Sequence, residues 1–104
     1  MSFLELENNN YYYEIIGSGP PLVLSHPYMS STSHWHKSGW VEILSRDNTL
    51  IMFDYTGHGK SSCPKQIDKY YISYVSKILI NILDHNEIDK FSIFGFFPFS
   101  KSRT

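Results

Sequence analysis

The sequence predicts an α/β fold, in which a mostly parallel sheet carries an antiparallel hairpin at one edge and helices on its faces. Two strand-like segments joined by an asparagine-rich turn come first, and three short, continuously apolar segments follow. A segment with helical periodicity separates the last two of these apolar segments. Strands that alternate with helices are typical of parallel pairing with right-handed crossovers. Continuously apolar strands are typical of a sheet that is covered on both faces.

The first strands are predicted from two different patterns. Residues 3–7 alternate between apolar and acidic side chains, which favours a half-buried strand. Residues 8–10 are all Asn and predict a turn, and residues 11–16 are aromatic and β-branched, which favours a returning strand. The pair predicts a hairpin at the sheet edge. Glycines and prolines over residues 17–21 interrupt the pattern before residues 22–25, the first buried strand.

The middle of the chain alternates loops with short regular elements. Residues 26–38 are rich in Ser and His and are expected to form a loop. Residues 40–44 predict a short helix with Trp40, Ile43 and Leu44 on one face. Residues 50–53 predict a second buried strand, which Asp54 ends.

One long helix and a last strand complete the pattern. A loop is expected over residues 57–62, and apolar side chains then recur at steps of three and four from residue 71 to residue 83. This spacing predicts a helix with one apolar face and a stop at Asn86. The face contains Ile72, Val75, Leu79, Ile82 and Leu83. Residues 91–94 predict a third buried strand.

Composition narrows the classes of function. A chain of 104 residues suits one small domain, and its net charge of −1 gives no electrostatic footprint for nucleic acid or an acidic membrane surface. Cys63 is the single cysteine, so no disulfide can form within one chain. No apolar run reaches the length of about 18 residues that a membrane span needs, and no signal peptide is recognisable. We therefore expect a cytoplasmic protein that binds neither nucleic acid nor membrane.

The order of the motifs resembles one known superfamily. An apolar strand ends in His26, and the next strand ends in the pattern Asp-x-x-Gly-His-Gly-x-Ser over residues 54–61; a helix and a third strand ending in Gly95 follow. This order is similar to the N-terminal part of the α/β-hydrolase superfamily, in the branch of small esterases, lactonases and peptidases. The resemblance implies hydrolysis of acyl ester, lactone or amide bonds in a small acyl substrate, with no cofactor.

The resemblance also implies roles for the residues after the first buried strand. In the family this position carries His-Gly, and the next backbone N–H helps to form the oxyanion hole. Here the residues are His26, Pro27 and Tyr28, so the amide of Tyr28 is the candidate donor. Pro27 departs from the pattern and restricts the geometry of the loop. The side chain of His26 is expected to hydrogen-bond neighbouring loop backbone.

The glycine-rich motif implies a turn that shapes the mouth of the site. Gly57 and Gly59 allow positive φ on either side of His58, and Ser61 closes the motif. We expect Asp54 to accept hydrogen bonds from nearby loop amides, with a general-base role as the alternative.

The nucleophile position is where the sequence departs most from the family. The family places its serine in Gly-x-Ser-x-Gly, a tight turn between strand and helix. Aligned on Gly95, this chain has Phe97 in the nucleophile position, where no atom can attack a carbonyl. Pro98 has no N–H to serve as an oxyanion donor, and Phe99 replaces the closing glycine. A complete catalytic set is therefore not expected.

These departures predict a catalytically incompetent domain truncated at the nucleophile turn, over residues 1–96, with an aberrant tail over residues 97–104. The family's acid and histidine are expected later than residue 104. The open edge left beside residues 91–94 predicts self-association. The alternative function is a non-catalytic partial domain that binds a complementary C-terminal hydrolase fragment.

Two other groups of side chains could supply chemistry, but the sequence supports each of them less well than the family motifs. Ser61 and Ser62 lie near His58 in sequence, but no third group that could orient the histidine is evident. His34 and His36 supply only two potential zinc ligands, and a structural zinc site needs four. No metal is therefore expected.

Overall fold

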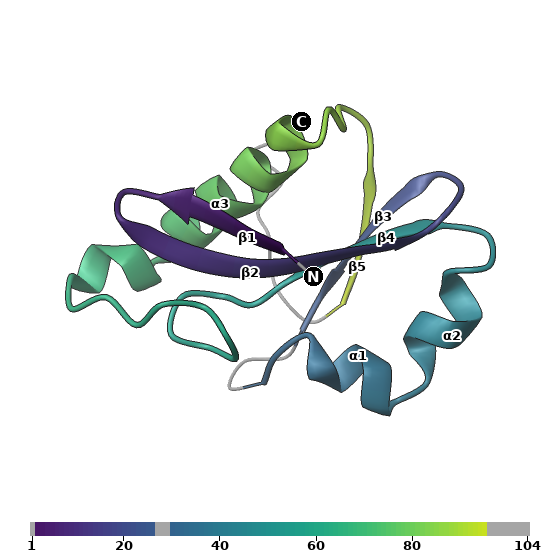
Figure 1. Cartoon of the computed structure of the whole chain (residues 1–104), viewed down its shortest axis with the longest axis horizontal. Helices are drawn as coiled ribbons and strands as arrows, with labels where there is room; N and C mark the ends of the chain where they lie inside the picture. The colour runs from purple at the N-terminus through teal and green to yellow at the C-terminus, as the bar shows by residue number, and fades with distance from the viewer. Residues whose placement is uncertain (1, 27–29, 96–104) are drawn as a thin grey trace.

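The computed structural model describes residues 2–26 and 30–95 and has the predicted α/β architecture (Figure 1). Its elements are β1 (Ser2–Leu6), β2 (Asn9–Gly17), β3 (Pro21–Ser25), α1 (Ser33–Lys37), α2 (Trp40–Leu44), β4 (Thr49–Phe53), the 3₁₀ helix η1 (Ile67–Tyr70), α3 (Ile72–His85) and β5 (Ser92–Gly95). The sheet has the strand order β1-β2-β4-β3-β5. β2 is antiparallel to both β1 and β4, whereas β3 is parallel to both β4 and β5. The sheet is thus mixed, with the hairpin at one edge and the parallel strands beside it.

The sheet is covered on both faces, as its apolar strands predict. Figure 1 shows α3 on one side of the sheet and α1 and α2 on the other. Successive residues of β4 point to opposite faces, so Ile51 joins the α3 core and Met52 joins the α1/α2 core. The α3 core contains Tyr11, Tyr13, Val23, Ile51, Phe53, Tyr55, Tyr74, Val75, Ile78, Leu79, Ile82 and Leu83. The α1/α2 core contains Leu24, Trp35, Val41, Leu50 and Met52.

Both predicted helices are present, but their buried faces differ from the prediction. In α2, Val41 is buried while Trp40 and Ile43 are 40% and 59% exposed. The helix has only five residues, so sequence periodicity could not fix which side meets the sheet. In α3, Ile72 in the first turn is exposed, and Tyr74 and Ile78 are buried instead. The helix ends with Asn86 as its C-terminal cap, as expected.

Two segments contradict the sequence prediction. The expected loop over residues 26–38 contains α1, whose Trp35 is buried against the sheet. The last strand was expected to be buried, but every residue of β5 is exposed. Burial was predicted from its apolar composition, whereas β5 lies at the end of the strand order and pairs only with β3 in the described part of the chain.

The first half of β2 bonds to a turn that follows β4 in sequence. The backbone N–H groups of Asn10 and Tyr12 donate to the hydroxyl oxygens of Ser62 and Ser61, each at 2.9 Å. Ser62 N–H in turn donates to the carbonyl oxygen of Asn10 at 2.8 Å. The two serines therefore continue, beyond the end of β4, the pairing that β4 makes with the second half of β2.

Glu7 joins the β1–β2 turn to the helical layer. Its carboxylate binds Lys69 of η1, and Tyr74 of α3 donates its hydroxyl to the same oxygen at 2.8 Å. Lys77 lies 3.5 Å from the other oxygen. The pKa of Glu7 is lowered to about 2; the hydrogen bond from Lys69 is the largest cause, and the hydrogen bond from Tyr74 is the next largest. The contact stays partly hydrated, because the Glu7 side chain is 45% exposed.

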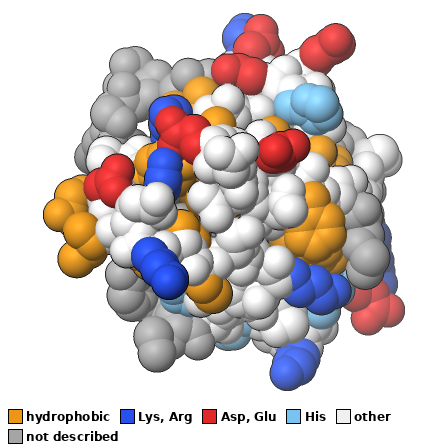
Figure 2. Space-filling model, turned by 60° about the vertical axis from the view of Figure 1, so that its left-hand side comes forward, with side chains coloured by type: hydrophobic (Ala, Val, Ile, Leu, Met, Phe, Trp, Pro, Cys, Tyr) orange, Lys and Arg blue, Asp and Glu red, His pale blue; other side chains and the backbone are white. Residues whose placement is uncertain are grey.

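The surface is mixed in character. Figure 2 shows acidic, basic and hydrophobic side chains all present on one face of the molecule, with no single kind covering it. Among the residues that the structure describes, no helix combines the length and the apolar character that a membrane crossing requires.

Candidate active site

The carboxyl ends of the three parallel strands meet at one edge of the sheet, where ligands of open α/β sheets bind. Residues opposite one another in the register include Leu24 and Met52, and Ser25 and Gly95. Gly95 has φ +143°, and a Cβ built there would lie 2.2 Å from the carbonyl oxygen of Ser25. Only glycine therefore allows β5 to end this close to β3, two residues before the position that the family uses for its nucleophile.

His26 has a structural role at this edge. It is 1% exposed, and its ring stacks on Tyr55 with 3.7 Å between ring centroids. The backbone N–H of Tyr55 donates to His26 Nε2 over a long 3.4 Å, and the Tyr55 hydroxyl donates to the His26 carbonyl oxygen at 2.9 Å. Burial raises the pKa of Tyr55, so its hydroxyl keeps the proton that it donates. The expected bond from the His26 ring to loop backbone is present.

Asp54 joins two loops through its carboxylate. The backbone N–H of Thr32 donates to Oδ1 at 2.7 Å, and the backbone N–H of Lys60 donates to Oδ2 at 2.9 Å. The residue is 1% exposed. These are the loop amide bonds that the sequence predicted, and they occupy both oxygens. The geometry therefore favours a positioning role over the alternative of a general base.

The glycine-rich turn has the backbone that its sequence requires. Gly57 and Gly59 have φ of +75° and +50°. A Cβ at Gly59 would lie 2.2 Å from Oδ2 of Asp54, and one at Gly57 would lie 2.6 Å from the Tyr70 ring. The turn must therefore lack a side chain at Gly59 to approach the carboxylate, and at Gly57 to lie against the Tyr70 ring.

The alternative serine nucleophile is not supported by the geometry. The Ser61 hydroxyl donates to the carbonyl oxygen of Asp54 at 2.6 Å and accepts from the backbone N–H of Tyr12. His58 Nδ1 lies 2.8 Å from the carbonyl oxygen of Thr56, so this nitrogen carries a proton and donates it. The hydroxyl of Ser61 is thus bonded to backbone rather than to an imidazole that could activate it.

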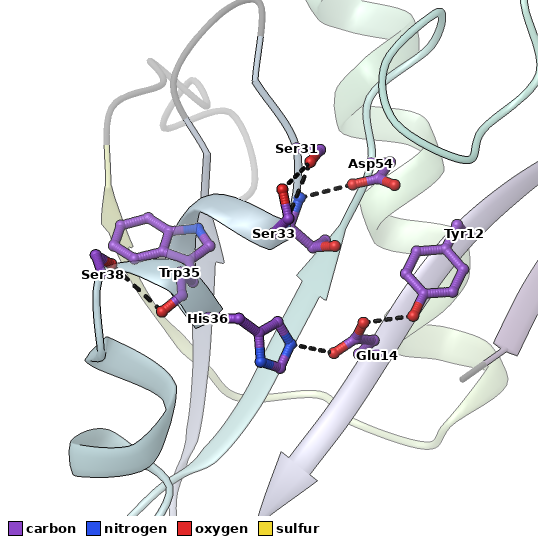
Figure 3. A network of polar contacts seen from close by, with 9 residues as sticks. Tyr12, Glu14, Ser31, Ser33, Trp35, His36, Ser38 and Asp54 are labelled. Atoms are coloured by element: carbon purple, nitrogen blue, oxygen red, sulfur yellow. Dashed lines mark hydrogen bonds and ion pairs between the residues drawn. The ribbon is translucent and has the colours of Figure 1, made fainter.

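His36 pairs with a carboxylate rather than with His34. Its Nε2 lies 2.7 Å from Oε1 of Glu14, and the Tyr12 hydroxyl bonds the other carboxylate oxygen (Figure 3). Burial acts to raise the pKa of Glu14, but the hydrogen bonds from Tyr12 and His36 outweigh it and the pKa is lowered. Within residues 2–26 and 30–95 no cluster of three potential metal ligands occurs.

Sequence reasoning missed the contact between Glu14 and His36. The two residues are 22 positions apart, and no local pattern links a strand to a five-residue helix. The available signal was that Glu14 is the one charged residue of β2. A carboxylate alone in an apolar strand needs a partner, which the sequence could suggest but not identify.

Two hollows flank the site. One of about 440 Å³ lies between β2, α1 and the glycine-rich turn, and is lined by Glu14, Ser31, Thr32, Ser33, His36, Lys37, Asp54, Gly59 and Lys60. The other, of about 230 Å³, lies beside the end of β5 and is mostly aromatic. It is lined by His34, Trp35, Trp40, Phe94 and Gly95.

The remaining predicted site residues lie outside the part of the chain that the structure describes. These are Tyr28, the candidate oxyanion donor, and Phe97, which occupies the nucleophile position. Pro98 and the predicted tail over residues 97–104 also lie outside it. The roles assigned to these positions stay predictions from the sequence.

Comparison with known proteins identifies the family. The α/β-hydrolase fold family matches residues 20–96, which is most of the chain. The protein therefore belongs to the α/β-hydrolase fold family, as the order of its motifs suggested. No curated protein matches the sequence significantly.

Solved structures of this family superpose closely on the chain. An α/β hydrolase from a Medee basin deep-sea metagenome library is 28% identical, with a TM-score of 0.81 over 90% of this chain and 34% of its own. An N-acyl homoserine lactone degrading enzyme is 25% identical, with a TM-score of 0.79 over 88% of this chain and 34% of its own. The enol-lactonase from Burkholderia xenovorans is 24% identical, with a TM-score of 0.80 over 91% of this chain and 36% of its own. The chain thus spans about a third of the length of these relatives.

Proposed function

We propose that this chain contributes the loop-positioning part of a hydrolase site for acyl ester, lactone or amide bonds, and forms no acyl intermediate itself. The observation that carries the proposal is the sequence after Gly95, where Phe97 and Pro98 stand in the nucleophile turn. A nucleophile needs an oxygen, sulfur or nitrogen atom that a base can activate, and Phe97 has none. Pro98 also removes the N–H expected to stabilise the oxyanion.

The described loops support the positioning half of this proposal. The segment after β3 is held at its start, where His26 bonds Tyr55, and again at Thr32, where Asp54 accepts the backbone N–H. A segment held at both ends suits the presentation of a backbone donor such as the predicted Tyr28 amide. The same carboxylate holds the glycine-rich turn through Lys60.

The experiment measures covalent labelling and turnover on the purified chain. We expect hydrolysis of an activated acyl ester at the rate of buffer alone, and no mass increase with a serine-directed phosphonate probe. Phe97→Ser, alone or with Pro98→Gly, is expected to remain unlabelled, because the family resemblance implies that the histidine and acid needed to activate the new hydroxyl come later than residue 104. A stoichiometric adduct on the unmodified chain would contradict the proposal, and Ser61→Ala would show whether that serine carries it.

The second candidate function is a non-catalytic partial domain that binds a complementary hydrolase polypeptide. Its support is that the superpositions include about 90% of this chain but only about a third of each solved relative. The test mixes this chain with the part of the metagenome hydrolase that has no counterpart here, and follows thermal unfolding. One cooperative transition above that of either polypeptide is expected if the two bind, and two unchanged transitions would exclude it.

We also propose a cellular compartment and a class of substrate for this protein. The single cysteine, exposed Cys63, is compatible with a reducing compartment, and we propose the cytoplasm. The lactone substrates of the relatives support a small acyl compound as the substrate class.

A further inference from the structure

The hollow of about 440 Å³ is separate from the edge where the family places its nucleophile. Its walls are β2, α1 and the glycine-rich turn, whereas the end of β5 borders the other hollow. Figure 3 shows Ser31, Ser33 and Asp54 in the upper part of the view and His36 with Glu14 in the lower part, and all five line this hollow. Small-molecule pockets are commonly about 300–1,000 Å³ in volume. The hollow is therefore large enough for a small ligand.

The two carboxylates that border the hollow already have donors from the protein itself. Asp54 accepts a backbone N–H at each oxygen. Glu14 accepts from the Tyr12 hydroxyl at one oxygen, and its other oxygen lies 2.7 Å from His36 Nε2. An ionised carboxylate only accepts hydrogen bonds, so His36 Nε2 carries the proton in this contact. Each acidic oxygen of the lining is thus engaged, which leaves the donors of the hollow to meet a ligand.

Two ammonium groups of the lining are free to act as such donors. Within residues 2–26 and 30–95, neither Lys37 nor Lys60 forms an ion pair with a carboxylate. Lys37 lies four residues after Ser33 on α1 and so shares its face of the helix. On the glycine-rich turn, Lys60 Nζ lies 4.6 Å from the centroid of the Tyr12 ring. The hollow therefore has one unpaired cation on α1 and another on the turn.

The hydroxyls of Ser31 and Ser33 add a neutral donor. Their Oγ atoms lie 2.7 Å apart, and the backbone N–H of Ser33 also donates to Ser31 Oγ. The contact between the two hydroxyls uses one of their two hydrogens. The second hydrogen has no acceptor among the residues that the structure describes, so it can be donated to a ligand oxygen.

We propose that this hollow binds the phosphate group of a small compound, through the ammonium groups of Lys37 and Lys60 and the hydroxyls of Ser31 and Ser33. Phosphate offers several acceptor oxygens and a negative charge, and hydrogen bonds between charged partners are the strong ones. The two lysines balance the charges of the two lining carboxylates while His36 is neutral. Binding therefore depends on direct contacts rather than on long-range attraction. The inference goes beyond the proposed function and does not depend on it.

Titration of the whole chain with inorganic phosphate, followed by NMR of the backbone amides at constant ionic strength, tests the proposal. We expect saturable shifts at residues 31–37 and 59–60. Lys37→Met and Lys60→Met keep an unbranched apolar chain and should each weaken binding by about 10-fold, the lower end for a hydrogen bond to a charged group. Lys90→Met is the matched control, because Lys90 is exposed and does not border the hollow. Affinity of the control is expected to be unchanged.

A phosphate monoester and a neutral compound complete the test. Glycerol 3-phosphate that binds more tightly than inorganic phosphate would support a phosphorylated compound as the ligand, and equal affinity would support free phosphate; both results keep the site. Glycerol should cause no shift. Lys37→Met decides alone if Lys60→Met is destabilised by losing its contact with the Tyr12 ring. Unsaturable shifts, the same shifts with glycerol, or equal weakening by all three substitutions would overturn the proposal.

Discussion

Replacing Asp54 by Ala should destabilise the protein more than any surface aspartate would, because its carboxylate accepts two backbone N–H groups. The residue is 1% exposed, and Thr32, one of the two donors, is 5% exposed. In Asp54→Ala the Thr32 amide loses its partner at a place that water barely reaches. Lys60 is exposed, so its amide can bond water instead.

The expected magnitude follows from these two environments. A hydrogen bond to a charged group contributes about 1.5–3 kcal/mol. We take the whole range, about 1.5–3 kcal/mol, for Thr32 and its lower end, about 1.5 kcal/mol, for Lys60, which gives a loss of about 3–4.5 kcal/mol. Domains of this size have a free energy of unfolding of about 5–15 kcal/mol, so the loss is a large fraction of the total. This loss corresponds to a fall in Tm of about 12–36 °C.

Urea denaturation followed by circular dichroism measures the change. Asp54→Asn keeps one carbonyl oxygen and should lose about half as much, since its amide group cannot accept from the second N–H. Asp89→Ala is the control, because that carboxylate is exposed and should change stability by about 0.5 kcal/mol or less. If Asp54→Ala unfolds at the same urea concentration as Asp89→Ala, the two amide bonds do not stabilise the fold and the reasoning is wrong.

Three further predictions concern other parts of the fold. The hydrogen bond from Lys69 is the main reason that the pKa of Glu7 is lowered to about 2. The charged carboxylate therefore stabilises the folded protein at pH values above the ordinary carboxyl pKa, and this stabilisation is lost as the pH falls from about 5 to 2. Tm measured over that range should fall less in Glu7→Gln, and an unchanged slope would contradict this. Gly95→Ala should lower Tm because its Cβ would lie 2.2 Å from the Ser25 carbonyl oxygen, whereas an unchanged Tm would mean that β5 can move away from β3. Ile82→Ala removes a fully buried side chain of α3 and should cost about 2–5 kcal/mol in urea unfolding, and a loss below about 1 kcal/mol would show that the α3 core is loosely packed.

Much of the fold could be predicted because its strong signals are local. Strands β3 and β4 are continuous apolar runs, and α3 is long enough for its periodicity to be read. The short helix α1 was missed because five residues with a single buried side chain, Trp35, carry no period. The exposure of β5 was missed because burial of an apolar strand depends on its neighbours in the sheet, which its own residues do not specify.

The contacts of the candidate site likewise include some that the local sequence could predict and some that it could not. The bonds of Asp54 could be predicted because an aspartate at a strand end beside a glycine-rich turn has backbone amides close by. The contact of Glu14 with His36, and that of Ser61 with Tyr12, join segments 22 and 49 residues apart. No pattern in one sequence specifies pairs at that separation. The positions of Tyr28 and Phe97 lie outside the described residues and rest on the family motif alone.

Ser61 and Ser62, at the end of the glycine-rich turn, help to set the pairing register of β2. Three identical side chains stand in a row there, Tyr11, Tyr12 and Tyr13, and all are buried. If the strand slid by one residue, two of these three rings would be exchanged for copies of themselves, so the tyrosines by themselves discriminate weakly between the two alignments. Ser61 and Ser62 discriminate strongly, since each hydroxyl accepts from one particular backbone N–H. Removing both hydroxyls is therefore expected to give a protein that still becomes compact but in which β2 pairs in more than one register.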